Sequence, residues 1–532
     1  MMQWDVAIVG AGMGGAALGY ALARAGHTVV FVEKGMMTFA DDGADDPDAP
    51  DEQLRLQHGR WPTQILACVD ERETHFYPPL GCGAGGSTLL YAGTLERLST
   101  ADFEDAPDRP QWPFPYRNLE PYYREVESLF RVRGSPDPFF EGPPAALRKP
   151  PSMTTSDGDL FNLLKRKGLK PYQLHNACEA KPGCLACGGT ICHRSCKHDA
   201  GRVLVESAMR TGRVSFLDMC TVETIDADAT AVKGLICRRN SERVVVQARF
   251  YALAAGALST PLLLQRSANR FWPNGVANSS DMVGRNLMFH VSDFVAVWPR
   301  GGSRTVDAER SLAVRDFYKS GDDDFGMIQS TGMAATMGNI VHVLKGMIDT
   351  GPLGWLRPLR RMLYAPAFIA AWLLGRATIL ATVLEDYPYL DNRVRPHPDH
   401  PDTIYFEYVI RPELRQRVRR FRRIYRAAFR PRRTMILTPN INLNFGHPCG
   451  TCRAGSDPRS SVVDGENRSH DLDNLLVVDA SFFPRSGGVN PSLTIAANGL
   501  RVGELLSARL HEMKRGAGDT TTGRMELGTP TA

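Results

Sequence analysis

A glycine-rich turn near the N-terminus constrains this chain more than any other feature. The turn reads Gly10-Ala-Gly12-Met-Gly14-Gly15 and follows a short apolar run at residues 5–9. Small residues recur at helical spacing over 12–25, and a second apolar run at 28–32 ends at Glu33, 18 positions after Gly15. A strand, a glycine turn, a helix and a second strand in this order predict a β-α-β unit that binds a dinucleotide.

Each glycine of the turn has a physical role in this prediction. Gly10 makes the tight turn, Gly12 lets the backbone approach a pyrophosphate at the helix N-terminus, and Gly15 allows close packing of helix on strand. Glu33 is expected to accept hydrogen bonds from a ribose. The pattern does not by itself separate NAD from FAD.

Composition excludes several classes of protein. The formal net charge is +5 over 532 residues, so charge alone does not indicate a nucleic-acid partner. A strand is expected within the first residues, with no basic segment and apolar core before it, and no apolar stretch reaches the ~20 residues of a spanning helix. We therefore expect a soluble, cytoplasmic protein.

Two further segments carry a family resemblance. Gly81–Gly93 reads GCGAGGSTLLYAG, and residues 446–501 contain GHPCGTC and NLLVVDASFFPRSGGVNPSLTIAANGLR. Together with weaker echoes at 254–261, 283–286 and 385–394, they resemble the glucose-methanol-choline (GMC) flavoprotein oxidoreductases. Some features are similar to the cholesterol oxidase-like branch and to the branch of sugar dehydrogenases that contains an Fe–S cluster.

The resemblance implies bound FAD and an α/β fold, in which a Rossmann-like FAD-binding domain (GMC fold) carries an interleaved α+β substrate domain. The FAD half is expected from 1–105, 190–290 and 440–515, the substrate half from 106–189 and 291–439, and a disordered tail from 516–532. The residues implied to bind FAD, besides Gly10, Gly12, Gly15 and Glu33, are Gly85, Gly86, Ser87, Val222, Ala255, Asp479, Ala480, Asn490, Pro491 and Thr494.

The family's catalytic pair is a histidine followed by a histidine or asparagine, which here matches His447 and Asn490. An alcohol becomes a hydride donor only as its hydroxyl loses its proton, and a histidine can take that proton near neutral pH. An asparagine can hold the same oxygen and orient the C–H bond toward flavin N5. For His290, which ends another family-like stretch, we favour a structural role.

Five cysteines crowd into residues 178–196. An Fe–S cluster held by Cys187, Cys192 and Cys196 is one interpretation, because thiolates at short spacings hold such clusters. Structural zinc with His193 or His198 is a second. Thiols or a disulfide without metal is the third, and the one we favour. Cys449 and Cys452 beside His447 form a second candidate redox pair, for which we favour packing thiols.

An arginine-rich stretch at 411–433 holds eleven Arg, with apolar residues at helical spacing, and Pro412 and Pro431 suit the ends of a helix. A solvated helix face is the favoured interpretation, and peripheral contact with an anionic membrane surface or an acidic partner is the alternative. No base-stacking or groove-reading module accompanies it, so we expect no nucleic-acid binding. The acidic loop at 38–52 is likewise expected to be a solvated surface loop rather than a docking site.

The sequence thus predicts an FAD-dependent oxidoreductase that oxidises the CH–OH group of a sugar, sterol or other bulky alcohol. The electron acceptor would be O2 or a redox partner protein. Two alternatives stay open: a redox-silent lyase on the same scaffold, and a flavin dehydrogenase subunit whose main task is to dock an electron-transfer partner.

Overall fold

The structure is a computed structural model. It describes residues 4–39, 49–104, 109–140, 142–179, 181, 184, 188–300, 310–321, 323–332, 340–341, 348 and 364–522.

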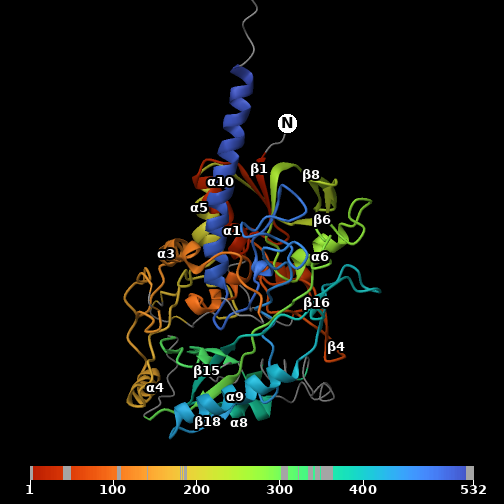
Figure 1. Cartoon of the computed structure of the whole chain (residues 1–532). Coiled ribbons are helices and arrows are strands. Elements are labelled where there is room, and N and C mark those ends of the chain that lie inside the picture. The colour runs from red at the N-terminus through yellow and green to blue at the C-terminus, as the bar shows by residue number, and fades with distance from the viewer. Residues whose placement is uncertain are drawn as a thin grey trace, which may run out of the picture.

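A parallel five-stranded sheet forms the centre of the first half, at the top of Figure 1. Its spatial order is β19 (Leu475–Val477), β9 (Ala248–Leu253), β1 (Trp4–Val9), β2 (Val29–Val32) and β5 (Val214–Leu217), all parallel. From β1 the chain builds β2 and then β5 on one side of β1, and later β9 and β19 on the other side. This reversal at β1 is the arrangement of a doubly wound dinucleotide fold. The Rossmann-like fold class is therefore confirmed.

Helices cover this sheet and bring the two ends of the chain together. The helix α1 (Met13–Arg24) packs against α10 (Ser492–Thr522), which in turn contacts α3 (Glu120–Leu129). Smaller elements complete this half. They are η1 (Gly86–Leu89), η2 (Thr100–Phe103), η3 (Tyr116–Asn118), η4 (Gly201–Val205), α5 (Glu206–Met209), α6 (Ser259–Arg266) and η6 (Ala480–Phe482), with the antiparallel strands β6 (Cys220–Ala227), β7 (Val232–Arg239) and β8 (Glu242–Val246).

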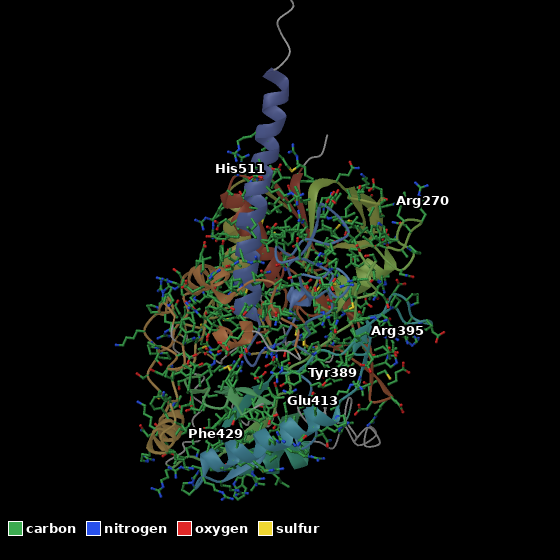
Figure 2. All side chains as sticks on the ribbon, in the orientation of Figure 1. Arg270, Tyr389, Arg395, Glu413, Phe429 and His511 are labelled. Carbon is green, nitrogen blue, oxygen red and sulfur yellow. The ribbon has the colours of Figure 1, made fainter. Side chains whose placement is uncertain are left out.

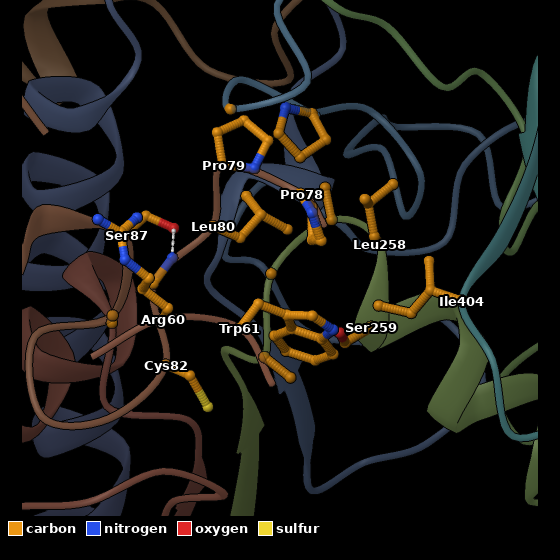
Figure 3. A pocket seen from close by; sticks show the side chains of 18 of the residues that line it. Arg60, Trp61, Pro78, Pro79, Leu80, Cys82, Ser87, Leu258, Ser259 and Ile404 are labelled. Atoms are coloured by element: carbon orange, nitrogen blue, oxygen red, sulfur yellow. Dashed lines mark hydrogen bonds between the residues drawn. The ribbon is translucent and has the colours of Figure 1, made fainter. Parts of the chain in front are cut away.

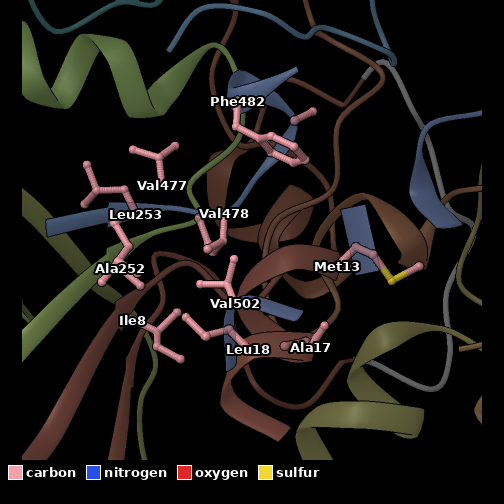
Figure 4. Packing of buried hydrophobic residues seen from close by; sticks show 14 of the residues in the cluster. Ile8, Met13, Ala17, Leu18, Ala252, Leu253, Val477, Val478, Phe482 and Val502 are labelled. Atoms are coloured by element: carbon pink, nitrogen blue, oxygen red, sulfur yellow. The ribbon is translucent and has the colours of Figure 1, made fainter. Parts of the chain in front are cut away.

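Close helix packing depends on glycines that face backbone. A Cβ at Gly14 would lie 2.1 Å from the Val478 oxygen, and one at Gly499 would lie 2.8 Å from the Gly14 oxygen. Figure 4 shows the apolar layer that results, with Leu18 of α1 and Val502 of α10 beside the strand residues Ile8 and Val477.

The second half of the molecule is built on two sheets whose strand pairs are antiparallel, except for β17 (Tyr405–Tyr408) with β3 (Ile65–Val69). One sheet has the order β11 (Ala313–Val314), β14 (Gly326–Ser330), β15 (Thr378–Leu384), β10 (Phe294–Val297) and β18 (Thr434–Ile436). A second has the order β16 (Arg393–Val394), β17, β3 and β4 (Arg72–Phe76). The remaining elements are α2 (Glu52–Gln57), α4 (Thr155–Arg166), α8 (Tyr364–Leu374), α9 (Pro412–Phe429) and the short pair β12 (Lys319–Ser320) and β13 (Asp323–Asp324).

Three boundaries differ from those expected. Residues 116–129, expected in the substrate half, form η3 and α3, and α3 packs against α10 in the first half. Strand β3 pairs in parallel with β17, so residues 65–76, which we expected in the FAD half, belong to a sheet with residues 393–408. Helix α10 runs to Thr522 and takes in the first residues of the segment expected as a disordered tail. The rest of the proposed division into two halves stays a prediction.

The arginine-rich stretch forms the predicted helix, α9, which begins at Pro412 and ends before Pro431. Glu413 in its first turn accepts the Tyr389 hydroxyl at 2.9 Å, and Phe429 is buried in its last turn (Figure 2). Many of its arginines form ion pairs within this half of the molecule. The pairs are Arg411–Asp391, Arg415–Asp70, Arg417–Glu413, Arg420–Asp323 and Arg422–Asp293.

Helix α8 differs from α9 because it exposes large apolar side chains. Phe368, Ile369, Trp372 and Leu373 are each more than half exposed. Within the described parts of the chain, no helix combines the length and the apolar character that crossing a membrane requires.

The glycines of the first turn predict a change in stability that can be measured. In Gly15→Ala the new Cβ would lie 2.2 Å from the Gly10 oxygen and 2.9 Å from the Ala254 Cβ. We expect destabilisation of about 1–3 kcal/mol or more, because backbone cannot move away as a flexible side chain can.

The matched control is Gly158→Ala in α4, where nothing lies within 4 Å of a new Cβ. There the change should stabilise by up to about 1 kcal/mol through helix propensity. Urea unfolding followed by circular dichroism measures both variants. Equal midpoints for the two would contradict the packing role of Gly15.

Candidate functional site

A cavity of about 1550 Å³ lies along the carboxyl edge of the parallel sheet and extends toward the second half of the molecule. Its wall contains most of the residues predicted for the site. They are Gly10, Gly12, Glu33, Gly86, Ser87, Val222, Ala255, His447, Asp479, Ala480 and Pro491. The fold therefore gathers predicted residues from five distant segments around one space.

Glu33, at the end of β2, ties two glycine loops together. Its Oε2 accepts the Ala11 N–H at 2.8 Å, and its Oε1 accepts the N–H groups of Gly35 at 2.8 Å and Gly83 at 3.0 Å. The side chain is buried, so these donors replace water around the carboxylate. Oε2 retains room to accept a hydroxyl from the cavity, as a ribose would require.

Asp479, which follows β19, likewise connects two segments of the chain, and it lies across β1 from Glu33 in the sheet. Its Oδ2 accepts the Gly256 N–H at 2.9 Å and the Thr260 hydroxyl at 2.5 Å, while Oδ1 accepts the Ser481 N–H at 2.9 Å. Burial raises the pKa of the Asp479 carboxyl, and these hydrogen bonds oppose that rise. Asp479 thus fixes the turn after β9 and the start of η6.

The space between these two turns suits a pyrophosphate. Gly10 has φ +96°, and a Cβ there would meet the Ala254 oxygen at 2.5 Å. At Gly12 the nearest atom to a new Cβ would be the Gly86 Cα, at 3.8 Å, which is an ordinary van der Waals contact, and this glycine lines the cavity. The N-terminus of α1 lies here, and that of α10 contributes Pro491 and Ser492 to the wall. Helix N-termini present N–H groups and positive potential to an anion.

His447 reaches the cavity from the loop before Pro448, and its Nδ1 faces other protein groups. That atom lies 3.1 Å from Nδ1 of His290 and 3.3 Å from Nδ2 of Asn444. Burial, followed by the neighbouring His290, lowers the pKa of His447 to about 3. The imidazole is therefore neutral at ordinary pH and able to accept a proton.

Asn490 lies next to the wall residue Pro491, and its Oδ1 is buried without a hydrogen-bond partner in the described chain. A buried amide oxygen that no protein group satisfies is costly, and a bound molecule that donates a hydrogen bond would remove the cost. The open Gly12 cradle and this unsatisfied oxygen fit a bound dinucleotide and a hydroxyl-bearing substrate.

Four of the predicted residues do not reach the cavity wall: Gly15, Gly85, Asn490 and Thr494. Gly15 packs against the turn, and the Gly85 N–H donates to the Ala11 oxygen at 2.9 Å. The Thr494 hydroxyl is hydrogen-bonded to that of Tyr123 at 2.9 Å in the buried interior. Gly15 and Thr494 are thus placed to support the site through packing, and their contact with a cofactor stays a prediction.

Sequence analysis missed the apolar end of the cavity, which Figure 3 shows. Trp61, Leu80, Leu258 and Ile404 surround a space beside the glycine loop, and the Gly81 N–H donates to the Ser87 hydroxyl at 3.1 Å. Lys34 lies over the Trp61 ring, 4.4 Å from its centroid. These residues carry no motif and come from separate segments.

The described cysteines near 178–196 are not in disulfides, and Cys192 and Cys196 are buried. Cys187 lies outside the described residues. Among the residues that are described, no three His, Cys, Asp or Glu side chains could hold a metal ion. The structure therefore gives the Fe–S hypothesis no support. Cys449 and Cys452 are buried free thiols, and the pKa of each is raised by burial.

Glycine turns that suit a pyrophosphate, with a histidine in the wall of the same cavity, are typical of enzymes that carry out redox chemistry with a bound dinucleotide. Comparison with known proteins narrows this class. Two GMC oxidoreductase family models match the chain, one over residues 9–292 and the other over residues 388–499. The chain belongs to the GMC oxidoreductases, a family of FAD-dependent enzymes that act on alcohol groups.

Relatives match along almost the whole chain. The 6'''-hydroxyparomomycin C oxidase of Streptomyces lividus is 29% identical over 95% of this chain and 92% of its own length. The fructose dehydrogenase large subunit of Gluconobacter japonicus is 26% identical over 96% of this chain and 98% of its own. The crystal structure of pyridoxine 4-oxidase from Mesorbium loti has a similar fold, with a TM-score of 0.63 at 18% identity, covering 94% of this chain and 99% of that one.

The open space at Gly12 predicts a variant that folds but does not hold FAD. In Gly12→Asp the side chain would enter the space proposed for the pyrophosphate and bring a like charge, while its Cβ makes only an ordinary van der Waals contact. We expect a melting temperature near that of the wild type and loss of flavin from the purified protein. Flavin absorbance per mole of protein measures this.

Gly158→Asp adds the same side chain on α4, where nothing lies within 4 Å of the new Cβ. This control should retain its flavin. A Gly12→Asp protein that purifies folded with its full flavin content would show that the pyrophosphate lies elsewhere.

Proposed function

We propose that this protein oxidises a CH–OH group of a polyhydroxylated, sugar-like alcohol to a carbonyl. The observation that carries the proposal is the position of the His447 imidazole in the wall of a cavity that suits FAD. The names of the relatives from Streptomyces lividus and Gluconobacter japonicus, an aminoglycoside oxidase and a fructose dehydrogenase subunit, support the substrate class.

Different residues of the chain have different roles in this reaction. His447 accepts the hydroxyl proton of the substrate at its free ring nitrogen, Nε2, and Asn490 donates or accepts a hydrogen bond at the same oxygen. Together they hold the C–H bond in one direction, which lowers the entropic part of the barrier. Bound FAD supplies a two-electron acceptor for the hydrogen at carbon. Glu33, Gly12 and the N-termini of α1 and α10 hold the ribose and pyrophosphate.

Several finer statements remain proposals. The acceptor that reoxidises the flavin would be O2 or a redox partner protein, and a cytoplasmic location and peripheral membrane contact stay predictions.

A lyase activity that leaves the flavin oxidised is the competing function. Anaerobic mixing with candidate sugars, amino sugars and short diols distinguishes the two, because only an alcohol oxidoreductase bleaches its flavin.

Replacing His447 tests the proposed base. His447→Ala should keep its fold and flavin and lower the rate of flavin reduction by about 10²- to 10⁴-fold, the usual loss for a general base. Asn490→Ala should slow the same step through looser orientation of the alcohol. Anaerobic stopped-flow absorbance measures both, with deuterium at the carbinol carbon to identify the step.

His400 is exposed and does not line the cavity, so His400→Ala provides the control. Its flavin reduction should match that of the wild type. Wild-type rates in His447→Ala would remove this histidine from the mechanism.

The low pKa of His447 predicts an unusual pH profile. An ordinary imidazole is half protonated at 6.5, but burial beside His290 lowers the pKa of His447 to about 3. Since only the unprotonated ring accepts a proton, the acid limb due to His447 should lie far below 6.5. The rate of flavin reduction against pH, at saturating alcohol, measures this. A limb near 6.5 that disappears in His447→Ala would contradict it.

A further inference from the structure

His290 is a buried histidine behind the cavity wall that contacts both His447 and a backbone carbonyl. Its Nδ1 lies 3.1 Å from Nδ1 of His447, and its Nε2 lies 3.0 Å from the Gly487 oxygen. The two rings meet edge to face, with centroids 5.2 Å apart and planes at 89°. His290 does not line the cavity, so it can act on a substrate only through His447.

The carbonyl of Gly487 fixes where the hydrogen of His290 lies. A carbonyl oxygen only accepts, so Nε2 of His290 must carry the hydrogen of this bond. A neutral imidazole has one N–H, which leaves Nδ1 of His290 as an acceptor. The only hydrogen that can lie between the two Nδ1 atoms then belongs to His447. The hydrogen of His447 is therefore on Nδ1, and its Nε2 is left as a free acceptor.

Asn444 favours the opposite tautomer of His447, in which the hydrogen is on Nε2. Its Oδ1 accepts the Gly446 N–H at 3.1 Å, which fixes the orientation of the amide and turns Nδ2 toward Nδ1 of His447 at 3.3 Å. That N–H could donate only if Nδ1 of His447 had no hydrogen. The Asn444 N–H has an alternative acceptor in the Ser292 hydroxyl at 3.5 Å, whereas within the described chain Nδ1 of His290 has no other hydrogen-bond donor.

The two neighbours of His447 thus compete over its tautomer. An acceptor buried without a donor costs more than a weakened amide bond, so the contact with His290 decides the outcome. Burial lowers the pKa of His290 to about 4 and that of His447 to about 3, in keeping with two neutral rings.

We propose that His290 is a positioning residue that holds His447 as the Nδ1–H tautomer and so keeps Nε2 free to accept the proton of the substrate. A proton that arrives at Nε2 gives an imidazolium whose Nδ1–H still donates to His290. The charge is then shared across that bond, and the Gly487 carbonyl stabilises the far end of the pair. This role rests on the proposed function of His447 as the base, but the tautomer itself does not.

The tautomer can be measured without any substrate. Long-range ¹H–¹⁵N correlation spectra of the flavin-loaded protein, labelled with ¹⁵N-histidine, distinguish a protonated ring nitrogen from an unprotonated one. The signals of His447 and His290 are assigned from His447→Ala and His290→Ala. We expect a protonated Nδ1 in His447 and a protonated Nε2 in His290. A wild-type His447 with its hydrogen on Nε2 would overturn the proposal.

Two variants separate positioning from packing. In His290→Ala, Asn444 becomes the only neighbour of Nδ1, so His447 should change to the Nε2–H tautomer and flavin reduction should fall by about 10²- to 10⁴-fold. In His290→Asn, an amide oxygen takes the place of the Nδ1 acceptor, so the wild-type tautomer and most of the rate should return. Both variants lose the ring and its packing, and melting temperatures record that shared cost.

A third variant removes the competitor. Adding Asn444→Leu to His290→Ala should return part of the Nδ1–H tautomer and part of the rate. If the tautomer stays Nδ1–H in His290→Ala, or if the rates of His290→Asn and His290→Ala are equally low, His290 does not position the base. If no alcohol reduces the wild-type flavin, the proposed function fails, while the tautomer measurement still decides the role of His290.

Discussion

Two buried carboxylates, bonded to backbone and hydroxyl groups rather than to cations, organise the binding edge of this protein. Glu33 takes three N–H groups from two glycine loops, and Asp479 takes donors from the turn after β9 and from η6. Each carboxylate replaces its lost hydration with N–H and O–H donors that the sheet already positions. The loops must therefore remain where the strands end, and the space between them stays open to a ligand.

This edge requires both ends of the chain. Strand β1 and helix α1 come from the first 24 residues, whereas β19 and α10 come from residues 475–522. Gly14 and Gly499 let α1 and α10 approach until backbone meets backbone, and the N-termini of both helices then face one cavity. Helix N-termini present N–H groups and positive potential, so this edge suits the phosphates of a dinucleotide.

The sequence predicted what is local in the chain. Gly10 to Glu33 form one β-α-β unit, so their spacing in the sequence predicts where they lie in the fold. His447 was predicted from the motif around it. The pairing of β3 with β17 was missed because the two strands are more than 300 residues apart, and neither carries a signal of its partner. Trp61, Leu258 and Ile404 were missed for the same reason. Residues 516–522 look like a polar tail in composition, yet they continue helix α10.

The role of His290 shows why a buried site needs more than a base of the right type. In a triad with a carboxylate behind the histidine, the negative charge would raise the pKa of the base and hold the imidazolium. Here the group behind His447 is another neutral ring, and the nearby carboxylate of Glu385 is already paired with Arg485 at 3.0 Å. The His290–His447 pair therefore carries no charge before substrate binds, which avoids the cost of burying an imidazolium. The cost is a weakly basic histidine, so the proton should leave the hydroxyl only as the C–H bond also breaks. The orientation of the free Nε2 of His447 toward the substrate then matters more than the basicity of that nitrogen. The hydrogen bond to His290 sets this orientation.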